Sequence, residues 1–422
     1  MANAGSAVAE PGWLTARRER AAITRGSLPL PDADVPGWEF TSLAGLDLEA
    51  FPPLEDGAGG DEPAHSDVFA VPAGSAHLRQ VDGRTSAVEG ELPDGVIVAT
   101  LSEAVREHAG LVERHLGSVV SGDDVFVAHN DAAWTGGLFV YVPPHTRLEA
   151  PVLATAVQGA ENATLPWRAL IVLEEGAQAE VWEQYLGSHD GLFNAVVELV
   201  VGPAANLRYV CAQGLDENAW IFGSQRAEVD RDAHLEWVVL GFGSGRGKLR
   251  TEAKLAGRGS TAKVTGAYAT RGRQHIDFDT TQEHAAQDTV SDLAFRGLLD
   301  GRSTAVWRGM IKVDPGAQKT DAFQESRNLL LSKRAHADAI PGLEIQADDV
   351  RCTHAAAIAQ IDREQLFYLR ARGLREAVAR RLVIEGFLQE LVERFPEGAL
   401  HDALSGALER RLEQVLSPRG GS

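Results

Sequence analysis

The run Ala195-Val196-Val197-Glu198-Leu199-Val200-Val201 is apolar and rich in β-branched side chains. Leu138-Phe139-Val140-Tyr141-Val142 is a second run of the same kind. Such side chains are typical of strands, because they pack well on the pleated surface of a sheet. Similar short runs recur from Gly136 to about Ile361, so the sequence predicts strands along this whole segment.

Turn-like tripeptides precede such runs at intervals of roughly 27 residues, and a period of this length indicates stacked structural units. They are Gly176-Ala177-Gln178, Ala204-Ala205-Asn206, Asp232-Ala233-His234, Arg258-Gly259-Ser260 and Ala285-Ala286-Gln287. Two architectures fit this spacing: a β-sandwich built of hairpins, and a parallel β-helix whose coils lie on one another. The length of the array favours the β-helix, so we expect a mainly β protein with its core at residues 136–361.

The segment before this core, residues 1–135, reads as a helical adaptor region. Helix candidates lie at Trp13–Ala22 and at Leu101–Leu116, and the prolines at Pro29, Pro31 and Pro36 end the first of them. Between Asp56 and His65 the glycine-rich, acidic sequence predicts a flexible loop, because it offers little apolar area to offset the entropy of ordering.

The segment after the core, residues 362–422, predicts a helical domain. Asp362 is placed to cap a first helix that ends near Gly373, and a second helix is predicted at Leu374–Phe395. A third helix carries a leucine every four residues, at Leu400, Leu404, Leu408, Leu412 and Leu416. This narrow apolar stripe must face either the neighbouring helices or another protein, and packing within the domain is the favoured interpretation.

Composition excludes several classes of function. The formal net charge of -20 repels phosphate backbones and anionic lipid headgroups, so nucleic acid and membrane surfaces are poor partners. No stretch approaches the roughly 18 apolar residues that a membrane-spanning helix needs, and Met1–Pro11 does not resemble a secretory signal, so we expect a cytosolic protein. With Cys211 and Cys352 as the only cysteines, a cluster or zinc ion cannot be held by thiolates of this chain alone.

The segment from Gly241 to Lys248 is rich in glycine and invites comparison with a phosphate-binding loop. Phe242 stands where the first glycine belongs, and Leu249 replaces the required Ser or Thr. We therefore predict a mobile glycine turn between strands, and no nucleotide site.

Two clusters could hold a metal ion. Alternation along a strand puts His275, Asp277 and Asp279 on one face, although a simply solvated face is the favoured interpretation. Alternation also puts Cys352 and His354 on one face, as a borderline-soft pair suited to ferrous iron or zinc. Two ligands make only half a site, and such a pair is more often involved in packing and hydrogen bonding.

A long series of further motifs runs from His275 to Gly373. It includes Thr280–His284, Thr289-Val290-Ser291-Asp292, Gly309-Met310-Ile311-Lys312-Val313, Ala317–Ala322, Asn328–Ser332, Pro341-Gly342-Leu343-Glu344-Ile345, Asp348–His354 and Leu366–Gly373. Two less distinctive motifs of the series lie at Gly37–Leu43 and Gly137–Pro143. This series resembles the SufB/SufD family, whose members form the scaffold of the SUF iron-sulfur assembly complex.

Details favour the SufD branch of that family. Cys352-Thr353-His354, followed by Phe367-Tyr368-Leu369-Arg370, is similar to the SufD form of the motif. Where the SufB branch carries its principal cluster-assembly cysteine this chain has Ala335, and where that branch has a glutamate after the shared histidine it has Ala355. The SufD branch usually has glycine at this last position, so Ala355 also departs from its pattern.

The resemblance implies a right-handed parallel β-helix with flanking helical regions and a non-catalytic role beside two partners. In this picture SufC hydrolyses ATP, SufB receives sulfur, and the SufD-like chain supports iron entry and cluster formation at its interface with SufB. It implies no catalytic or tightly bound cofactor site, only transient iron or an iron-sulfur cluster shared with SufB. His354 then becomes a candidate iron ligand or proton carrier, with Cys352 as a less certain helper.

Partner docking is also implied by the resemblance. The C-terminal helices bind SufC, and the residues assigned to that surface are Leu366, Phe367, Leu374, Leu382, Phe387 and Leu391. A heterodimer with SufB is expected, and a homodimer is possible when the chain is isolated. The alternatives are a SufB-like paralogue that builds the cluster itself and, from a different class, a β-helix enzyme acting on carbohydrates, supported only by the carboxylates between Asp277 and Glu283.

Overall fold

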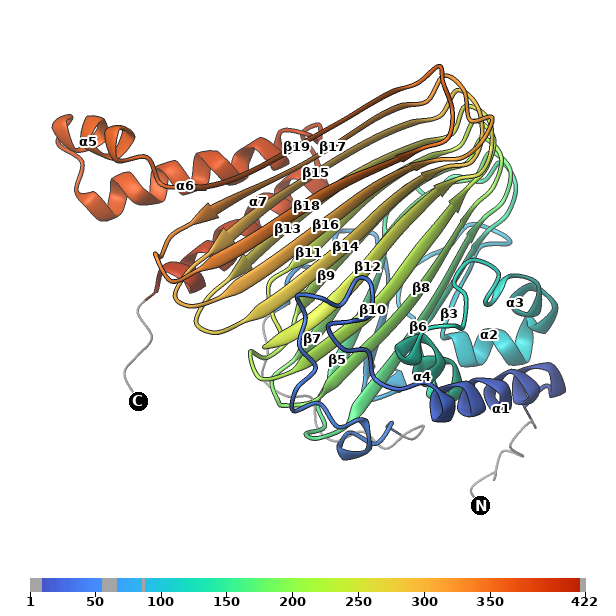
Figure 1. Cartoon of the computed structure of the whole chain (residues 1–422). Coiled ribbons are helices and arrows are strands. Elements are labelled where there is room, and N and C mark those ends of the chain that lie inside the picture. The colour runs from blue at the N-terminus through green and yellow to red at the C-terminus, as the bar shows by residue number, and fades with distance from the viewer. Residues whose placement is uncertain (1–9, 55–66, 86–87, 418–422) are drawn as a thin grey trace.

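The computed structural model describes residues 10–54, 67–85 and 88–417 (Figure 1). Its centre is a stack of coils in which alternate strands pair in parallel and consecutive strands lie in opposite sheets. The odd sheet contains β5 (Val152–Gln158), β7 (Gln178–Gly187), β9 (Asn206–Gly214), β11 (His234–Gly241), β13 (Thr261–Thr270), β15 (Val290–Leu299), β17 (Asp321–Leu330) and β19 (Arg351–Gln360). The even sheet contains β4 (Leu138–Val142), β6 (Thr164–Leu173), β8 (Leu192–Val201), β10 (Trp220–Val229), β12 (Arg246–Leu255), β14 (His275–His284), β16 (Thr304–Val313) and β18 (His336–Ile345). The predicted parallel β-helix is thus confirmed, and the sandwich of hairpins is wrong.

Register in the stack is regular. His275 of β14 pairs with Arg246 of β12 below and with Thr304 of β16 above, and the pairing continues without a slip to the ends of these strands. Since side chains alternate between the two faces of a strand, residues at matching positions form columns that point all inward or all outward. If one side chain of a column points inward, the other side chains of that column point inward too.

The predicted turns are the corners of this stack. Gly176, Ala204, Asp232 and Gly259 all have positive φ, at 68°, 54°, 56° and 74°. Each lies just before a strand of the odd sheet, where the chain changes direction. In the fifth predicted turn, the residue with positive φ is Asp288, at 59°, immediately after the tripeptide that the spacing singled out. A left-handed corner at a regular interval explains the repeat seen in the sequence.

The core lies between the two sheets and continues on their outer faces. In β15, Leu293, Phe295 and Leu299 point into the coil interior, whereas Ala294 and Leu298 point outward into a second apolar cluster beneath the C-terminal helices. Because both faces of these strands are covered, the strands read as continuous apolar runs with little alternation.

Helices close the beginning of the stack. They are α1 (Gly12–Ser27), α2 (Leu101–Glu107), α3 (Ala109–His115), α4 (Val125–Ala133) and the short 3₁₀ helix η1 (Leu48–Ala50). The helix predicted at residues 13–22 is confirmed and extends to Ser27. The single helix predicted at residues 101–116 is wrong, because His108 leaves helical geometry, with φ -131° and ψ 35°, and divides it in two.

A buried ion network fastens α4 to the even sheet. The guanidinium of Arg168 contacts Asp131 of α4 at 2.8 Å and also pairs with Glu198 of β8, and both side chains of the Arg168–Glu198 pair are fully buried. Glu198 accepts further hydrogen bonds from the backbone N–H groups of Gly117, Val119 and Val120. Each buried charge therefore has partners, which is the condition for tolerating charge in a core.

The first strands cap the stack with antiparallel pairs. β1 (Ala76–Val81) pairs with β5 in parallel, β2 (Arg84–Thr85) turns back against β1, and β3 (Ile97–Ala99) runs antiparallel to β4.

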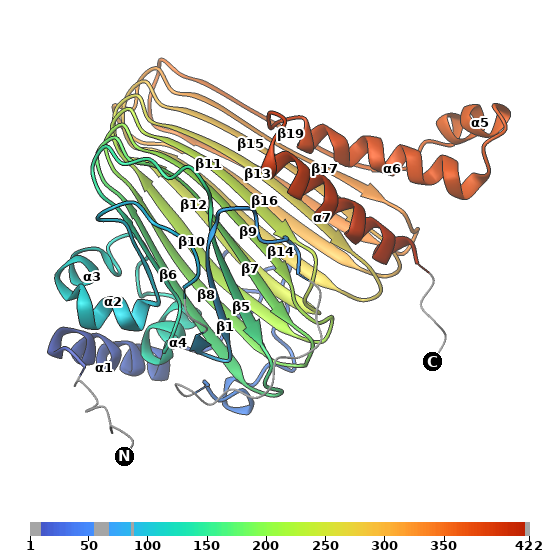
Figure 2. The same ribbon diagram turned by 180° about the vertical axis from the view of Figure 1, so that it is seen from behind.

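Three helices follow the last coil: α5 (Arg363–Ala371), α6 (Glu376–Val392) and α7 (Ala399–Leu416). α6 and α7 lie along the odd sheet, while α5 projects beyond it (Figures 1 and 2). Asp362 caps α5 and Gly373 follows it with φ +91°, as predicted. Four leucines of the α7 stripe, from Leu400 to Leu412, are buried against the chain's own core, and Leu416 is 36% exposed. Packing within the chain is thus the correct interpretation of this stripe. None of the helices described here is long and apolar enough to cross a membrane.

A buried histidine in the coil interior gives the fold a pH dependence. The side chain of His284 is buried, with Nδ1 2.8 Å from Thr289 Oγ1 and Nε2 2.9 Å from Ser291 Oγ. Burial lowers the pKa of His284 from 6.5 to about 4. Below pH 6.5 the unfolded chain therefore binds a proton at this residue that the folded chain does not, so stability falls as the pH falls.

We expect this one histidine to cost about 1 kcal/mol of unfolding free energy between about pH 7.5 and about pH 5.5. Urea titrations of the wild type and of His284→Gln at both pH values measure it, because the variant keeps a polar side chain but cannot titrate. The difference between the two pH values should shrink by that amount in the variant. An unchanged difference would show that His284 is protonated in the folded chain as readily as in the unfolded one.

Candidate functional site

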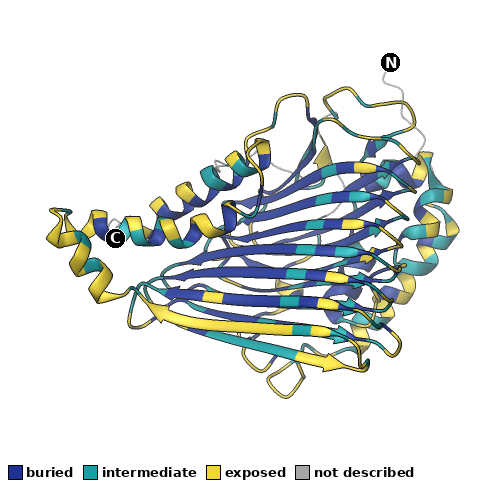
Figure 3. Ribbon diagram, turned by 90° about the horizontal axis from the view of Figure 1, so that it is seen from above, coloured by how far each residue is buried: buried dark blue, intermediate teal, exposed yellow. Residues whose placement is uncertain are grey.

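The last coil of the stack is open. β18 and β19 end the order of their two sheets, so each has a parallel neighbour on one side only. Exposure rises sharply there: every residue of β19 but Cys352 is exposed, as the terminal strands in Figure 3 show. Leu343 and Ile345 of β18 and Ile358 of β19 are 39%, 42% and 45% exposed. An unpaired strand edge with apolar side chains is a template for another chain.

Cys352 and His354 lie on this open coil. Cys352 pairs in register with Ala322 and His354 with Gln324, and both of these partners are buried in the coil below. The two side chains therefore belong to the inward-pointing columns of the odd sheet, on the same face of β19, as the alternation predicted. His354 is exposed and Cys352 half-buried because no further coil covers them.

The thiol of Cys352 is not activated by its surroundings. Burial raises its pKa, and the nearby carboxylate of Asp321 raises it further. A thiol must lose its proton to bind a metal ion or act as a nucleophile. Within the described parts of the chain no three His, Cys, Asp or Glu side chains gather into a metal-binding group. Cys352 and His354 are therefore at most a partial ligand set on this chain.

The residues assigned to the helical docking surface separate by exposure. Phe367 of α5 is 74% exposed and Leu382 of α6 is 45% exposed, and Tyr368 beside Phe367 is 56% exposed. Leu366, Leu374 and Phe387 are half-buried, the last of them against the cluster under the helices. Leu391 is 3% exposed and packs within that cluster, so its side chain is not presented to a partner.

The face that carries His275, Asp277 and Asp279 is covered, so the predicted solvated face is wrong. The segment before η1 crosses it, and the hydroxyl of Thr41 donates to Asp277 Oδ2 at 2.6 Å and lies 3.0 Å from His275 Nε2. Asp277 is 1% exposed as a result. Nearby, Arg308 of β16 contacts Glu39 at 2.6 Å, which fastens the same segment.

A lysine occupies the place that a metal ion would take in this cluster. The ammonium group of Lys248 lies 2.8 Å from Asp277 Oδ2 and 3.5 Å from Asp279 Oδ2, and its side chain is only 4% exposed. The sequence did not indicate that Thr41 or Lys248 contacts this face. Thr41 is 236 positions from Asp277 in the chain, and Lys248 lies on the neighbouring strand, β12.

Residues 242–245 of the glycine-rich segment connect β11 to β12, with Phe242 buried, and the end of the segment belongs to β12. The turn between strands is thus confirmed, while its mobility stays a prediction. Lys248, the last residue of the segment, lies in β12, where it is held by Asp277 and is not directed at a free phosphate site.

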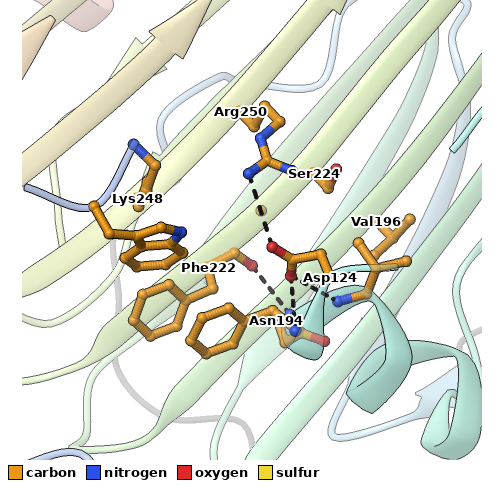
Figure 4. A pocket seen from close by; sticks show the side chains of 11 residues that line it. Asp124, Asn194, Val196, Phe222, Ser224, Lys248 and Arg250 are labelled. Carbon is orange, nitrogen blue, oxygen red and sulfur yellow. Dashed lines mark hydrogen bonds and ion pairs between the residues drawn. The ribbon is translucent and has the colours of Figure 1, made fainter. Parts of the chain in front are cut away.

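Beside this lysine lies a small aromatic pocket (Figure 4). Its lining includes Trp38, Phe126 and Phe222. Asp124 and Arg250, which also line it, approach each other at 3.8 Å. The pocket admits about 20 Å³, which is room for one water molecule. It is too small for a nucleotide or a comparable ligand.

Comparison with known proteins shows which family this chain resembles. Residues 156–387 match the family model described as "SUF system FeS cluster assembly, SufBD core domain", and residues 81–153 match "SufBD protein N-terminal region". The chain is 30% identical to "Iron-sulfur cluster assembly protein SufD" of Bacillus subtilis over 416 residues, which covers 96% of this chain and 95% of that protein. It is 30% identical to a SufBD family protein of Mycobacterium tuberculosis over 330 residues, 76% of this chain and 83% of that one. A SufBD family protein of Staphylococcus epidermidis is 30% identical over 317 residues, 73% of this chain and 68% of its own.

The Lys248–Asp277 pair makes a prediction about stability. We expect Asp277→Ala to cost about 3–5 kcal/mol of unfolding free energy, because it leaves a buried ammonium without its closest partner. The double variant Lys248→Met with Asp277→Leu should regain most of this loss, since no buried charge is left. Chemical denaturation of the three proteins measures it. A stabilisation of the wild type by added divalent metal that Asp277→Ala abolishes would contradict the structural role.

Proposed function

The chain belongs to the SufBD family of SUF-system iron-sulfur cluster assembly proteins, and from this premise we propose that it acts as a SufD-like, non-catalytic scaffold subunit. In this proposal its open coil pairs with SufB, its C-terminal helices bind the ATPase SufC, and His354 takes part in iron entry at the shared boundary. The observation that carries the proposal is the open last coil, in which two strand edges and a half-set of metal ligands occur together.

The open edges support a partner of the same architecture. β18 and β19 present their backbone N–H and C=O groups side by side in two facing sheets. A second solenoid with an open coil satisfies both rows at once and covers Leu343, Ile345 and Ile358. SufB is the partner that we propose, and a second copy of this chain fills the same place when SufB is absent.

The partial ligand set supports a role that needs this partner. His354 offers an exposed imidazole, which binds iron well, while the thiol of Cys352 stays protonated until a cation or a metal lowers its pKa. A cluster formed here draws its remaining ligands from SufB. Iron and sulfide are cargo in this scheme and are passed on.

The SufD-like assignment is favoured over a SufB-like one by two alanines. Ala335, at the turn before β18, and Ala355, on β19, stand where the SufB branch is expected to have its cysteine and glutamate. A methyl group supplies neither a thiolate nor a carboxylate, so the cluster cannot be assembled on this chain alone. The carbohydrate-enzyme alternative loses its support, because Asp277, the first of its carboxylates, is buried under Thr41 and paired with Lys248.

We expect His354→Ala to leave the complex with SufB and SufC intact and to lower the yield of reconstituted cluster about tenfold, a loss of the size that follows damage to a metal's ligand environment. Anaerobic reconstitution followed by iron and sulfide analysis measures the yield, and size-exclusion chromatography checks assembly. His234→Ala, which removes another exposed histidine far from the open coil, is the matched control. Equal yields from the two variants would remove His354 from the mechanism.

The docking of SufC is tested best on exposed side chains. Truncation after Arg394 removes α7 and uncovers the apolar cluster on the odd sheet, so a truncated chain confounds docking with folding. We expect Phe367→Asp with Leu382→Asp to weaken SufC binding by about thirtyfold or more, because exposed apolar anchors of this kind carry most of an interface's energy. Pull-down and calorimetry with purified SufC measure the effect.

Ile23→Asp is the control for this docking experiment. Ile23 is 72% exposed on α1, at the other end of the molecule, and the substitution adds the same charge to an apolar surface position. Undiminished SufC binding by the Phe367 and Leu382 variant would place the docking surface elsewhere.

A further inference from the structure

A cavity lies between α7 and the carboxyl ends of the odd-sheet strands, away from the open coil and from the exposed part of α5 and α6. Its volume is about 350 Å³, within the range of small-molecule sites. Its lining includes Gly187, Gly214 and Gly243 near the ends of β7, β9 and β11, and three arginines, Arg271, Arg410 and Arg411. The three guanidinium groups come from two elements far apart in sequence, the β13–β14 turn and α7.

Arg411 is buried and forms no ion pair with the described residues. Only 6% of it is exposed, and its guanidinium donates to the carbonyl of Ala269 at 2.9 and 2.7 Å, to Gln274 Oε1 at 3.0 Å and to Gln414 Oε1 at 3.1 Å. All of these acceptors are neutral. Burial lowers the pKa of Arg411 to about 10, with Glu217 opposing the shift and Arg271 adding to it. A buried cation that lacks an anionic partner is costly to keep.

Arg410 adds a second cation at the rim. It is exposed, and its guanidinium donates to the carbonyl of Val68 at 2.7 Å. Within the described residues, no carboxylate forms an ion pair with Arg410 or Arg411. In a chain with a net charge of -20, two adjacent positive charges therefore lie beside this cavity.

Three carboxylates, those of Asp67, Asp216 and Glu217, also line the cavity. Glu217 pairs with Arg271, and Asp67 lies 3.6 Å from the guanidinium of Arg79. Asp216 accepts a hydrogen bond from the backbone N–H of Asn218 at 2.8 Å. Asp67 and Glu217 thus have arginine partners. Among the described lining residues, Asp216 is the carboxylate that forms no ion pair with an arginine, and Arg410 and Arg411 are the arginines that form none with a carboxylate.

We propose that this cavity binds a small oxyanion, a phosphate or a carboxylate, through Arg410 and Arg411. Arg410 makes one hydrogen bond, to Val68, and its other N–H groups can hold the oxygen pair of either group by charge-assisted hydrogen bonds. Arg411 already makes four hydrogen bonds to protein acceptors, so it contributes mainly its charge. Binding places an anion beside Arg411, which forms no ion pair with the described residues. The cavity contains neither His354 nor the exposed residues of α5 and α6, so failure of the proposed function would leave this proposal unaffected.

The test uses the full-length chain with inorganic phosphate, pyrophosphate and citrate as probes. We expect at least one of them to bind saturably in calorimetry and to raise the melting temperature, whereas sodium chloride at matched ionic strength does not. Arg410→Gln should weaken that binding about tenfold, the equivalent of one lost charge-assisted hydrogen bond. Which probe binds best separates the phosphate from the carboxylate source.

Arg334→Gln is the matched control, because it removes the same charge from an exposed position that does not line the cavity. Arg410 is itself exposed, so its variant should fold, and circular dichroism checks this. Absence of saturable binding by all three probes would overturn the proposal. Equal affinities of the Arg410 and Arg334 variants would overturn it as well.

Discussion

Backbone hydrogen bonding between parallel, in-register strands is the constraint on which this molecule depends. Each strand of a solenoid satisfies its N–H and C=O groups on the strands above and below, so a stack has unsatisfied rows only at its two ends. At the beginning, the antiparallel strands β2 and β3 and the N-terminal helices close the stack. At the other end β18 and β19 stay open, with exposed apolar side chains along them. The two ends of the stack therefore differ, and the open coil is the end at which, in the proposed function, a similar solenoid pairs.

The outer faces of the stack are organised by a different interaction, the pairing of buried charges. Arg168 joins Asp131 and Glu198 beneath α4, and Lys248 joins Asp277 beneath the segment that carries Thr41. Regular coils offer columns of side chains, and packing alone leaves an added segment free to slide along them. Ion pairs with directional hydrogen bonds select one position, and they add this specificity to the apolar contacts that Trp38, Leu43 and Leu46 make with the sheet.

In the proposed function, the role of this chain depends on a coil and a ligand set that are each incomplete. A fully capped stack would need no partner, and a complete ligand set would hold a metal ion instead of passing it on. The open coil carries a half-buried thiol and an exposed imidazole without a third ligand among the described residues. The C-terminal helices also combine buried and exposed surfaces. α6 and α7 bury their apolar faces on the odd sheet, while Phe367 and Leu382 stay exposed. The same chain thus separates the surfaces that stabilise it from those that remain available.

The sequence by itself determined the features that depend on local periodicity. Turn residues at a regular interval indicated a repeating array of strands, and the length of the array favoured stacked coils over a sandwich. Alternation along a strand put Cys352 and His354 on one face, since it is a property of a few consecutive residues. Tertiary structure alone decided which faces are covered. Asp277 is buried by Thr41, Leu391 is buried although Leu382 is exposed, and Arg410 and Arg411 meet Arg271 in one cavity. These outcomes depend on contacts between segments far apart in the chain, and a local pattern carries no record of what packs against it.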